Sequence, residues 1–172
     1  MRWVVLVALA AVFGFCDTFP DLDFKIKVDT VGTKEKIICT NGLRLNYNSR
    51  SGGVSLNFLA KNYSDVVSVS LMNIFERKYR SGQYGKFERA ILLLDDNKTI
   101  TINMPRSNEV GQDEYVELGV GSITLQDLEK IANAKKIEVK IVGSDRNETI
   151  EHGQIDKNFI PNVKKFLEKI EQ

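Results

Sequence analysis

Residue types that build reactive or cross-linked sites are scarce in this chain of 172 residues, which has two cysteines, one histidine, one tryptophan and three prolines. A single histidine excludes a metal site with two histidine ligands from one chain. The charges nearly cancel, with 24 Lys and Arg against 23 Asp and Glu, and nucleic-acid-binding proteins need a basic excess to hold phosphates. The spacings of a P-loop, a dinucleotide-binding motif, a serine nucleophile elbow and an EF-hand are also missing. We therefore expect no metal ion, no cofactor and no nucleic-acid partner.

The first sixteen residues have the layout of an export signal. Arg2 supplies a positive charge, residues 3–16 form an uncharged apolar run, and charges begin at Asp17. A run of this length is too short to span a bilayer, which takes about 20 residues, and is typical of a secretory signal peptide. We expect residues 1–16 to be removed and the protein to be periplasmic or secreted. A lipid anchor at Cys16 is the less favoured alternative, because Phe15 stands where lipoproteins carry a small residue.

The remaining residues, 17–172, are predicted to form a single β-rich domain. No repeat, linker or change of composition divides them. They contain one cysteine, Cys39, so the domain has no internal disulfide. Its stability must then come from a packed core, which a chain of this length can supply. No other segment has the length and apolarity of a transmembrane helix.

Apolar residues alternate with polar ones along most of this domain. Because successive side chains of a strand point to opposite faces, such alternation predicts antiparallel strands with one buried face and one solvated face. In the last such segment, Val116, Leu118 and Val120 are predicted to be buried, opposite Tyr115 and Glu117. The alternating segments are 22–28, 43–47, 54–58, 67–71, 100–104 and 116–120.

Turn sequences separate these segments. Asn41-Gly42 favours a type I′ hairpin between residues 37–40 and 43–45. Residues 49–53, 95–97 and 143–147 predict three further reversals. The pattern indicates an antiparallel meander of about nine or ten strands, arranged as a sandwich or a strongly curved sheet.

Two helices are predicted in the C-terminal half. Thr124 can cap the first, with Asp127 three residues later, and an apolar stripe follows through Leu128. The second runs from about residue 158 to 171, with Pro161 in its first turn, where the missing N–H costs little. The fold class is therefore α+β, mainly β.

The groups that could support catalysis are few. Cys39 and His152 could form a nucleophile–base pair, but Cys39 lies in an apolar strand, where a free cysteine is usually a core residue. Carboxylates such as those at 95–96 and 113–114 could form a hydrolytic pair in space, but they fall in predicted turns. We therefore assign no catalytic residue and no metal ligand, and expect the protein not to be an enzyme.

The segment 75–89 has unusual content. It holds five basic residues against two acids, with four aromatic residues between them. Guanidinium groups beside aromatic rings can bind an anionic or sugar-like partner by bidentate hydrogen bonds and stacking. We predict a binding surface that includes Arg77, Tyr79, Arg80 and Tyr84. The alternative is a hairpin connection whose long cationic side chains cover apolar surface.

The domain resembles small exported bacterial proteins of unknown function from host-associated species. The resemblance rests on the export signal, the strand meander and the closing runs 123–131 (ITLQDLEKI) and 136–141 (KIEVKI). It implies no active-site residues.

We therefore expect an exported, non-enzymatic domain that binds another macromolecule, either a protein or a carbohydrate. The alternatives are a carrier of a small apolar ligand between sheet and helices, and a hydrolase with a carboxylate site. An exposed apolar patch favours the interaction domain, a lined cavity favours the carrier, and a cleft with two carboxylates favours the hydrolase.

Overall fold

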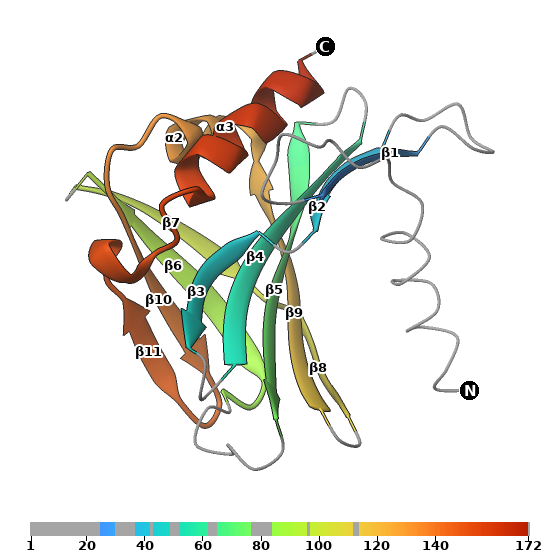
Figure 1. Cartoon of the computed structure of the whole chain (residues 1–172), viewed down its shortest axis with the longest axis vertical. Coiled ribbons are helices and arrows are strands. Elements are labelled where there is room, and N and C mark those ends of the chain that lie inside the picture. Colours follow the sequence, from blue (N-terminus) through green and yellow to red (C-terminus); the bar gives the residue numbers. More distant parts are fainter. Residues whose placement is uncertain are drawn as a thin grey trace.

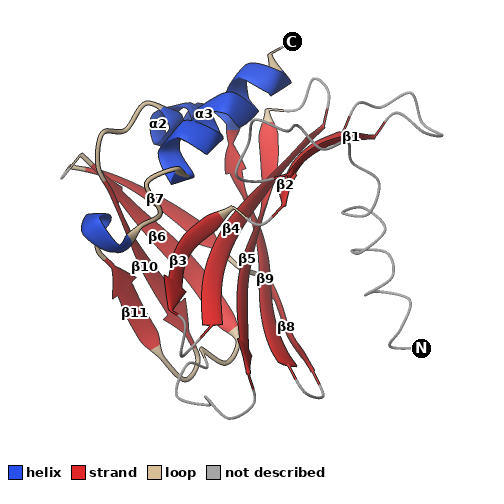
Figure 2. Cartoon of the chain, in the orientation of Figure 1, coloured by secondary structure: helices blue, strands red, loops and turns tan. Residues whose placement is uncertain are grey.

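The computed structural model describes residues 25–29, 37–41, 43–48, 52–61, 65–76, 84–95, 97–111 and 114–171. These residues form eleven strands, two α-helices and one short 3-10 helix, and most of them lie in strands (Figures 1 and 2). The α+β, mainly β class predicted from the alternating pattern is confirmed. The predicted signal peptide, residues 1–16, lies outside the described residues.

The strands form two antiparallel sheets. Sheet A has the order β1-β2-β4-β5-β9-β8, with β3 also paired to β4, and sheet B has the order β11-β10-β6-β7. Sheet A contains β1 (Lys25–Asp29), β2 (Ile37–Asn41), β3 (Arg44–Asn48), β4 (Gly52–Lys61), β5 (Val66–Glu76), β8 (Arg106–Gly111) and β9 (Glu114–Thr124). Sheet B contains β6 (Phe87–Leu94), β7 (Lys98–Asn103), β10 (Ile137–Gly143) and β11 (Asn147–Ile150).

Three of the predicted reversals are confirmed, because β3 pairs with β4, β6 with β7 and β10 with β11. Two other pairs join strands that are distant in the sequence. β5 pairs with β9, and β6 pairs with β10. The chain therefore leaves sheet A after β5, builds two strands of sheet B, and returns to sheet A for β8 and β9.

The hairpin predicted at Asn41-Gly42 is wrong. β2 and β3 both run antiparallel to β4, with Cys39 opposite Leu59 and Arg44 opposite Ser55. They are therefore two parts of one strand that bends between them.

Side chains of the neighbouring strands hold this bend. The Thr40 hydroxyl accepts a hydrogen bond from the Phe58 backbone N–H (2.8 Å), and the Asn57 side-chain oxygen accepts one from the Leu43 N–H (3.0 Å). These bonds satisfy the backbone N–H of Phe58 in β4 and that of Leu43 just before β3, and they tie both sides of the bend to β4, so the chain can continue along β4 instead of turning back.

Both helices form where the sequence predicts them. Helix α2 (Leu125–Ala132) begins after Thr124, whose hydroxyl accepts a hydrogen bond from the Asp127 N–H (3.1 Å), and helix α3 spans Phe159–Ile170. The helices contact each other and lie across one end of the space between the two sheets (Figure 2). There Phe166 of α3 stacks on Phe58 of β4, with ring centroids 6.1 Å apart. Neither described helix has the length and apolarity needed to cross a membrane.

Two glycines of β9 allow the sheets to meet. A Cβ at Gly121 would lie 2.2 Å from the backbone oxygen of Asn103, and a Cβ at Gly119 would lie 2.9 Å from the Cβ of Phe87. Because no larger residue fits at that separation, glycine is what permits β6 and β7 to pack directly against β9.

This contact reverses the predicted orientation of β9. Glu117 shares the inner face with the two glycines and is fully buried, whereas Val116, Leu118 and Val120 lie on the outer face and are partly exposed. The prediction that these three apolar residues are buried opposite a solvated Glu117 is therefore wrong. The inner face must be free of side chains where sheet B approaches, and alternation then turns the apolar residues outward.

Candidate interaction surface

The structure describes one of the four residues predicted to bind a partner. Arg77, Tyr79 and Arg80 fall within residues 77–83, outside the described residues. Tyr84 is described and is only 2% exposed, so its ring packs inside the molecule instead of lying on the surface as expected. The binding role of the other three stays a prediction.

Tyr84 belongs to a small polar cluster just before β6. Its hydroxyl donates a hydrogen bond to Glu148, the Arg146 guanidinium lies 5.6 Å from its ring centroid, and Arg146 pairs with Glu148 at 3.0 Å. Burial raises the pKa of the Tyr84 phenol well above its usual value, and the hydrogen bond to Glu148 raises it further. The phenol therefore stays neutral and acts as a donor.

Glu117 fixes the chain just before β6. Its carboxylate accepts hydrogen bonds from the backbone N–H groups of Tyr84 (2.9 Å) and Gly85 (2.8 Å) and from the side-chain amide of Asn73 (2.8 Å). Gly85 has φ +71°, and a Cβ there would lie 2.4 Å from the Ser144 hydroxyl oxygen. A charged acceptor is well suited to several converging N–H donors. This buried anchor also holds the orientation of β9, because its neighbours in the strand must then face outward.

The outer face of β5 and β9 carries a contiguous set of apolar side chains, which we call the outer patch. Met72 lies opposite Leu118, and Ile74 lies opposite Val116, in the register of the two strands. Ile74 is 42% exposed, and the other members are half-buried. The outer patch consists of Met72, Ile74, Val116, Leu118 and Val120.

The outer face of sheet B differs. Leu93 of β6 is also half-buried, but it lies between Glu138 of β10 and Thr99 of β7. Ile91 likewise lies between a lysine and a threonine. On the outer face of sheet B, each of these apolar residues therefore has polar residues as its cross-strand neighbours. On the outer face of sheet A, apolar residues of β5 and β9 lie directly opposite one another. Single exposed apolar residues are ordinary, but a contiguous patch is typical of an interaction site.

A hollow of about 210 Å³ adjoins the outer patch. Leu118 and Val120 form part of its wall, and Arg106 and Asn108 of β8 stand beside them as the strand partners of Val120 and Leu118. Asn57 of β4 closes the opposite side. A second hollow of about 390 Å³ lies on the other side of Arg106 and Val120, next to β7.

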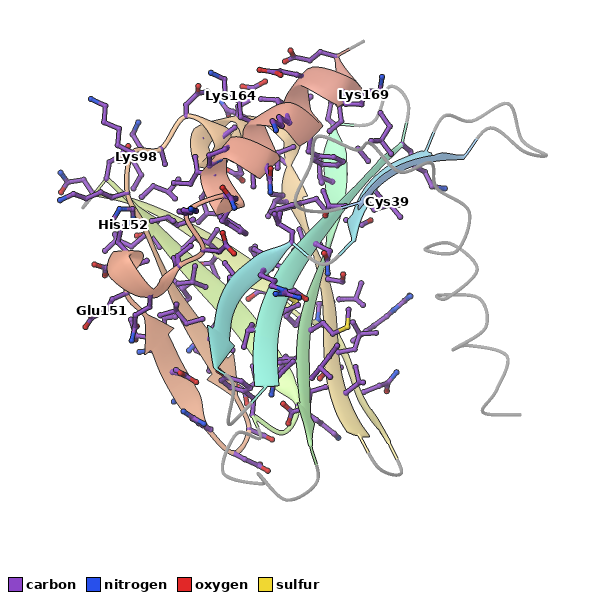
Figure 3. The ribbon with its side chains drawn as sticks, viewed as in Figure 1. Cys39, Lys98, Glu151, His152, Lys164 and Lys169 are labelled. Atoms are coloured by element: carbon purple, nitrogen blue, oxygen red, sulfur yellow. The ribbon has the colours of Figure 1, made fainter. Side chains whose placement is uncertain are left out.

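The possible nucleophile–base pair is not brought together. Cys39 lies in β2 and is fully buried, whereas His152 begins the 3-10 helix η2 (His152–Gln154), on the opposite side of the molecule (Figure 3). The His152 Nδ1 accepts a hydrogen bond from the Ile137 N–H at 3.4 Å. Cys39 and His152 therefore do not form a nucleophile–base pair in this structure.

The carboxylates of the predicted turns supply no described pair. Asp95 accepts hydrogen bonds from the backbone N–H groups of Lys135 and Lys136, both at 2.9 Å, and so ties the β6–β7 turn to the segment before β10. The bonds from Lys136 and Lys135 hold the pKa of Asp95 below its usual range. Asp96 and Asp113 lie outside the described residues. Within the described ranges, no group of three or more His, Cys, Asp or Glu residues could hold a metal ion.

Comparison of the chain with family models, curated proteins and solved structures gives no match. The outer patch and its hollows are the features of the described structure that bear on function.

Proposed function

We propose that this protein is an exported, non-enzymatic domain that binds another macromolecule through the outer patch of sheet A. The observation that carries the proposal is the orientation of β9. This strand buries Glu117 and presents Val116, Leu118 and Val120 toward solvent. An antiparallel sheet with one solvated face normally shows the opposite arrangement.

Energetics supports a binding role for this face. Apolar surface in contact with water disfavours the unbound state by about 25 cal/mol per Å², and a partner that covers the patch recovers that free energy. The surrounding serine, asparagine and arginine side chains match the polar rim of protein interfaces around an apolar centre.

The packing of the interior favours an interaction domain over a carrier of a small ligand. The place that a carrier would need, between sheet A and the helices, contains the stacked rings of Phe58 and Phe166. Both rings are fully buried, together with Leu128 and Val163 from the two helices.

A photo-crosslinking amino acid at position 118 tests the proposal in cells that export the protein. We expect a crosslinked partner from position 118 and none from the matched position 93, because Leu93 is also a half-buried leucine on an outer face. With that partner identified, Leu118→Asp should weaken binding at least tenfold, about 1.4 kcal/mol. Leu93→Asp should leave it unchanged. Equal crosslinking from both positions, or full affinity in a folded Leu118→Asp variant, would contradict the proposal.

The predicted removal of the export signal is tested separately. The uncharged run that ends before Asp17 leads us to expect a mature N-terminus between Gly14 and Asp17. The intact mass of the exported protein measures this directly. Retention of Met1 would overturn the predicted cleavage, and an added diacylglycerol on Cys16 would support the lipoprotein alternative.

A further inference from the structure

The hollow beside the outer patch has the size of a side-chain site. Its volume is about 210 Å³, whereas pockets for small-molecule ligands usually measure about 300–1,000 Å³. It also opens directly on the apolar patch, with which it shares Leu118 and Val120. One anchoring side chain of a docked partner would fill it while neighbouring residues of that partner cover the patch.

The described residues that line the hollow include one cation and no anion. Arg106 is the one ionisable residue among the described residues that line it, and the remaining polar groups are serine and asparagine side chains. The second hollow shares Arg106, and its other polar side chains are those of Thr101, Asn103 and Ser122. No carboxylate therefore lines either hollow among the described residues, and a partner's anion would meet a guanidinium without repulsion.

Arg106 is placed to act together with the apolar wall. It is exposed, and its strand partner is Val120 on the same face. An anion bound by the guanidinium would lie next to an apolar group in the hollow. Guanidinium groups bind carboxylates with two parallel, charge-assisted hydrogen bonds, which fix orientation as well as adding affinity.

These observations favour a peptide over a sugar. The walls of the hollow include apolar side chains, and its one aromatic residue, Phe58, is fully buried. A sugar would therefore find no exposed ring to stack on in this hollow. An apolar peptide side chain, in contrast, gains from leaving water.

We propose that the partner is a polypeptide with an acidic segment, in which an apolar side chain enters the hollow and an adjoining carboxylate pairs with Arg106. This inference rests on the proposed function, because it names the chemistry of the partner at the same surface.

Selection of a random peptide library on the purified protein tests this inference. We expect the enriched peptides to carry Asp or Glu within two positions of Leu, Ile, Met or Phe. Their affinity should fall at least tenfold for Arg106→Glu and should fall with rising salt, because screening weakens exposed charge pairs. Lys140→Glu is the matched control, since Lys140 is an exposed cation on sheet B, and it should bind as the unsubstituted protein does.

Each outcome separates the inference from the proposed function. Peptides that lose affinity in Leu118→Asp but keep it in Arg106→Glu would leave the outer patch as the binding surface and overturn the acidic partner. Peptides that bind Leu118→Asp at full affinity would overturn the proposed function as well. Enrichment of no peptide, together with Arg106-dependent binding of an acidic polysaccharide such as alginate, would overturn the polypeptide partner in favour of a carbohydrate.

Discussion

Gly121→Ala should destabilise the protein by about 3 kcal/mol or more, at or above the upper end of the usual cost of overpacking. The added Cβ would lie 2.2 Å from the backbone oxygen of Asn103 and 3.1 Å from the Ile102 Cγ2. A backbone atom cannot move aside as a flexible side chain can, so the two sheets must separate locally. The midpoint of urea denaturation measures the loss.

Gly153→Ala is the matched control. A Cβ at Gly153 meets no atom within 4 Å, so this variant should be neutral or slightly more stable through the lower entropy of its unfolded chain. If Gly121→Ala were as stable as Gly153→Ala, β6 and β7 could not pack against β9 as described.

Glu117→Ala should cost about 3 kcal/mol or more. The substitution removes the acceptor of three N–H groups, those of Tyr84, Gly85 and the Asn73 side chain. Each buried donor left without a partner costs about 1–3 kcal/mol. We expect the free energy of unfolding to fall accordingly, and amide hydrogen exchange at residues 84–85 to accelerate more than elsewhere.

Two further variants distinguish the loss of the hydrogen bonds to Glu117 from the effect of removing any carboxylate. Glu117→Gln keeps one acceptor oxygen and should be less destabilised than Glu117→Ala. Glu129→Ala removes an exposed carboxylate from α2 and should change stability by less than about 0.5 kcal/mol. A Glu117→Ala variant as stable as Glu129→Ala would show that the carboxylate does not hold the start of β6.

Local signals in the sequence were enough for much of the fold. The Thr124 cap, the apolar stripes of both helices and the turn at 95–97 each depend on residues close together in the chain, and the structure confirms all of them. The bend between β2 and β3 could not be predicted in this way. Asn41-Gly42 suits a hairpin, but the hydrogen bonds that stabilise the bend, which the Asn57 and Thr40 side chains accept, involve β4, more than ten residues away.

The orientation of β9 could not be predicted from alternation alone. Alternating valine and leucine opposite a glutamate predict that the apolar face is buried. Which face of β9 is buried depends instead on the side from which sheet B approaches. The sequence did contain one relevant signal, the two glycines at 119 and 121 in the middle of a strand. Glycine inside a strand often marks close approach of another backbone. With that signal, the outer patch could have been proposed from the sequence.

The binding role predicted for Arg77, Tyr79 and Arg80 stays a prediction, because these residues lie outside the described part of the chain. The composition of segment 75–89 predicts a binding surface, but Tyr84 is buried and donates a hydrogen bond to Glu148, and the outer patch consists of residues of β5 and β9 outside this segment. Composition shows which chemistry a segment contains, but only the sheet register shows which side chains of β5, β8 and β9 adjoin one another.

Thiol accessibility along β9 tests most directly whether this strand presents its apolar residues to solvent. Leu118→Cys and Ile123→Cys place a single added thiol on the outer and inner face respectively, and labelling is counted relative to the unsubstituted protein, whose Cys39 is fully buried. The structure predicts that the folded Leu118→Cys variant reacts readily with a small maleimide, whereas Ile123→Cys reacts at least tenfold more slowly until it is unfolded in urea. Protection at position 118 together with rapid labelling at position 123 would contradict the orientation of β9, and with it the outer patch.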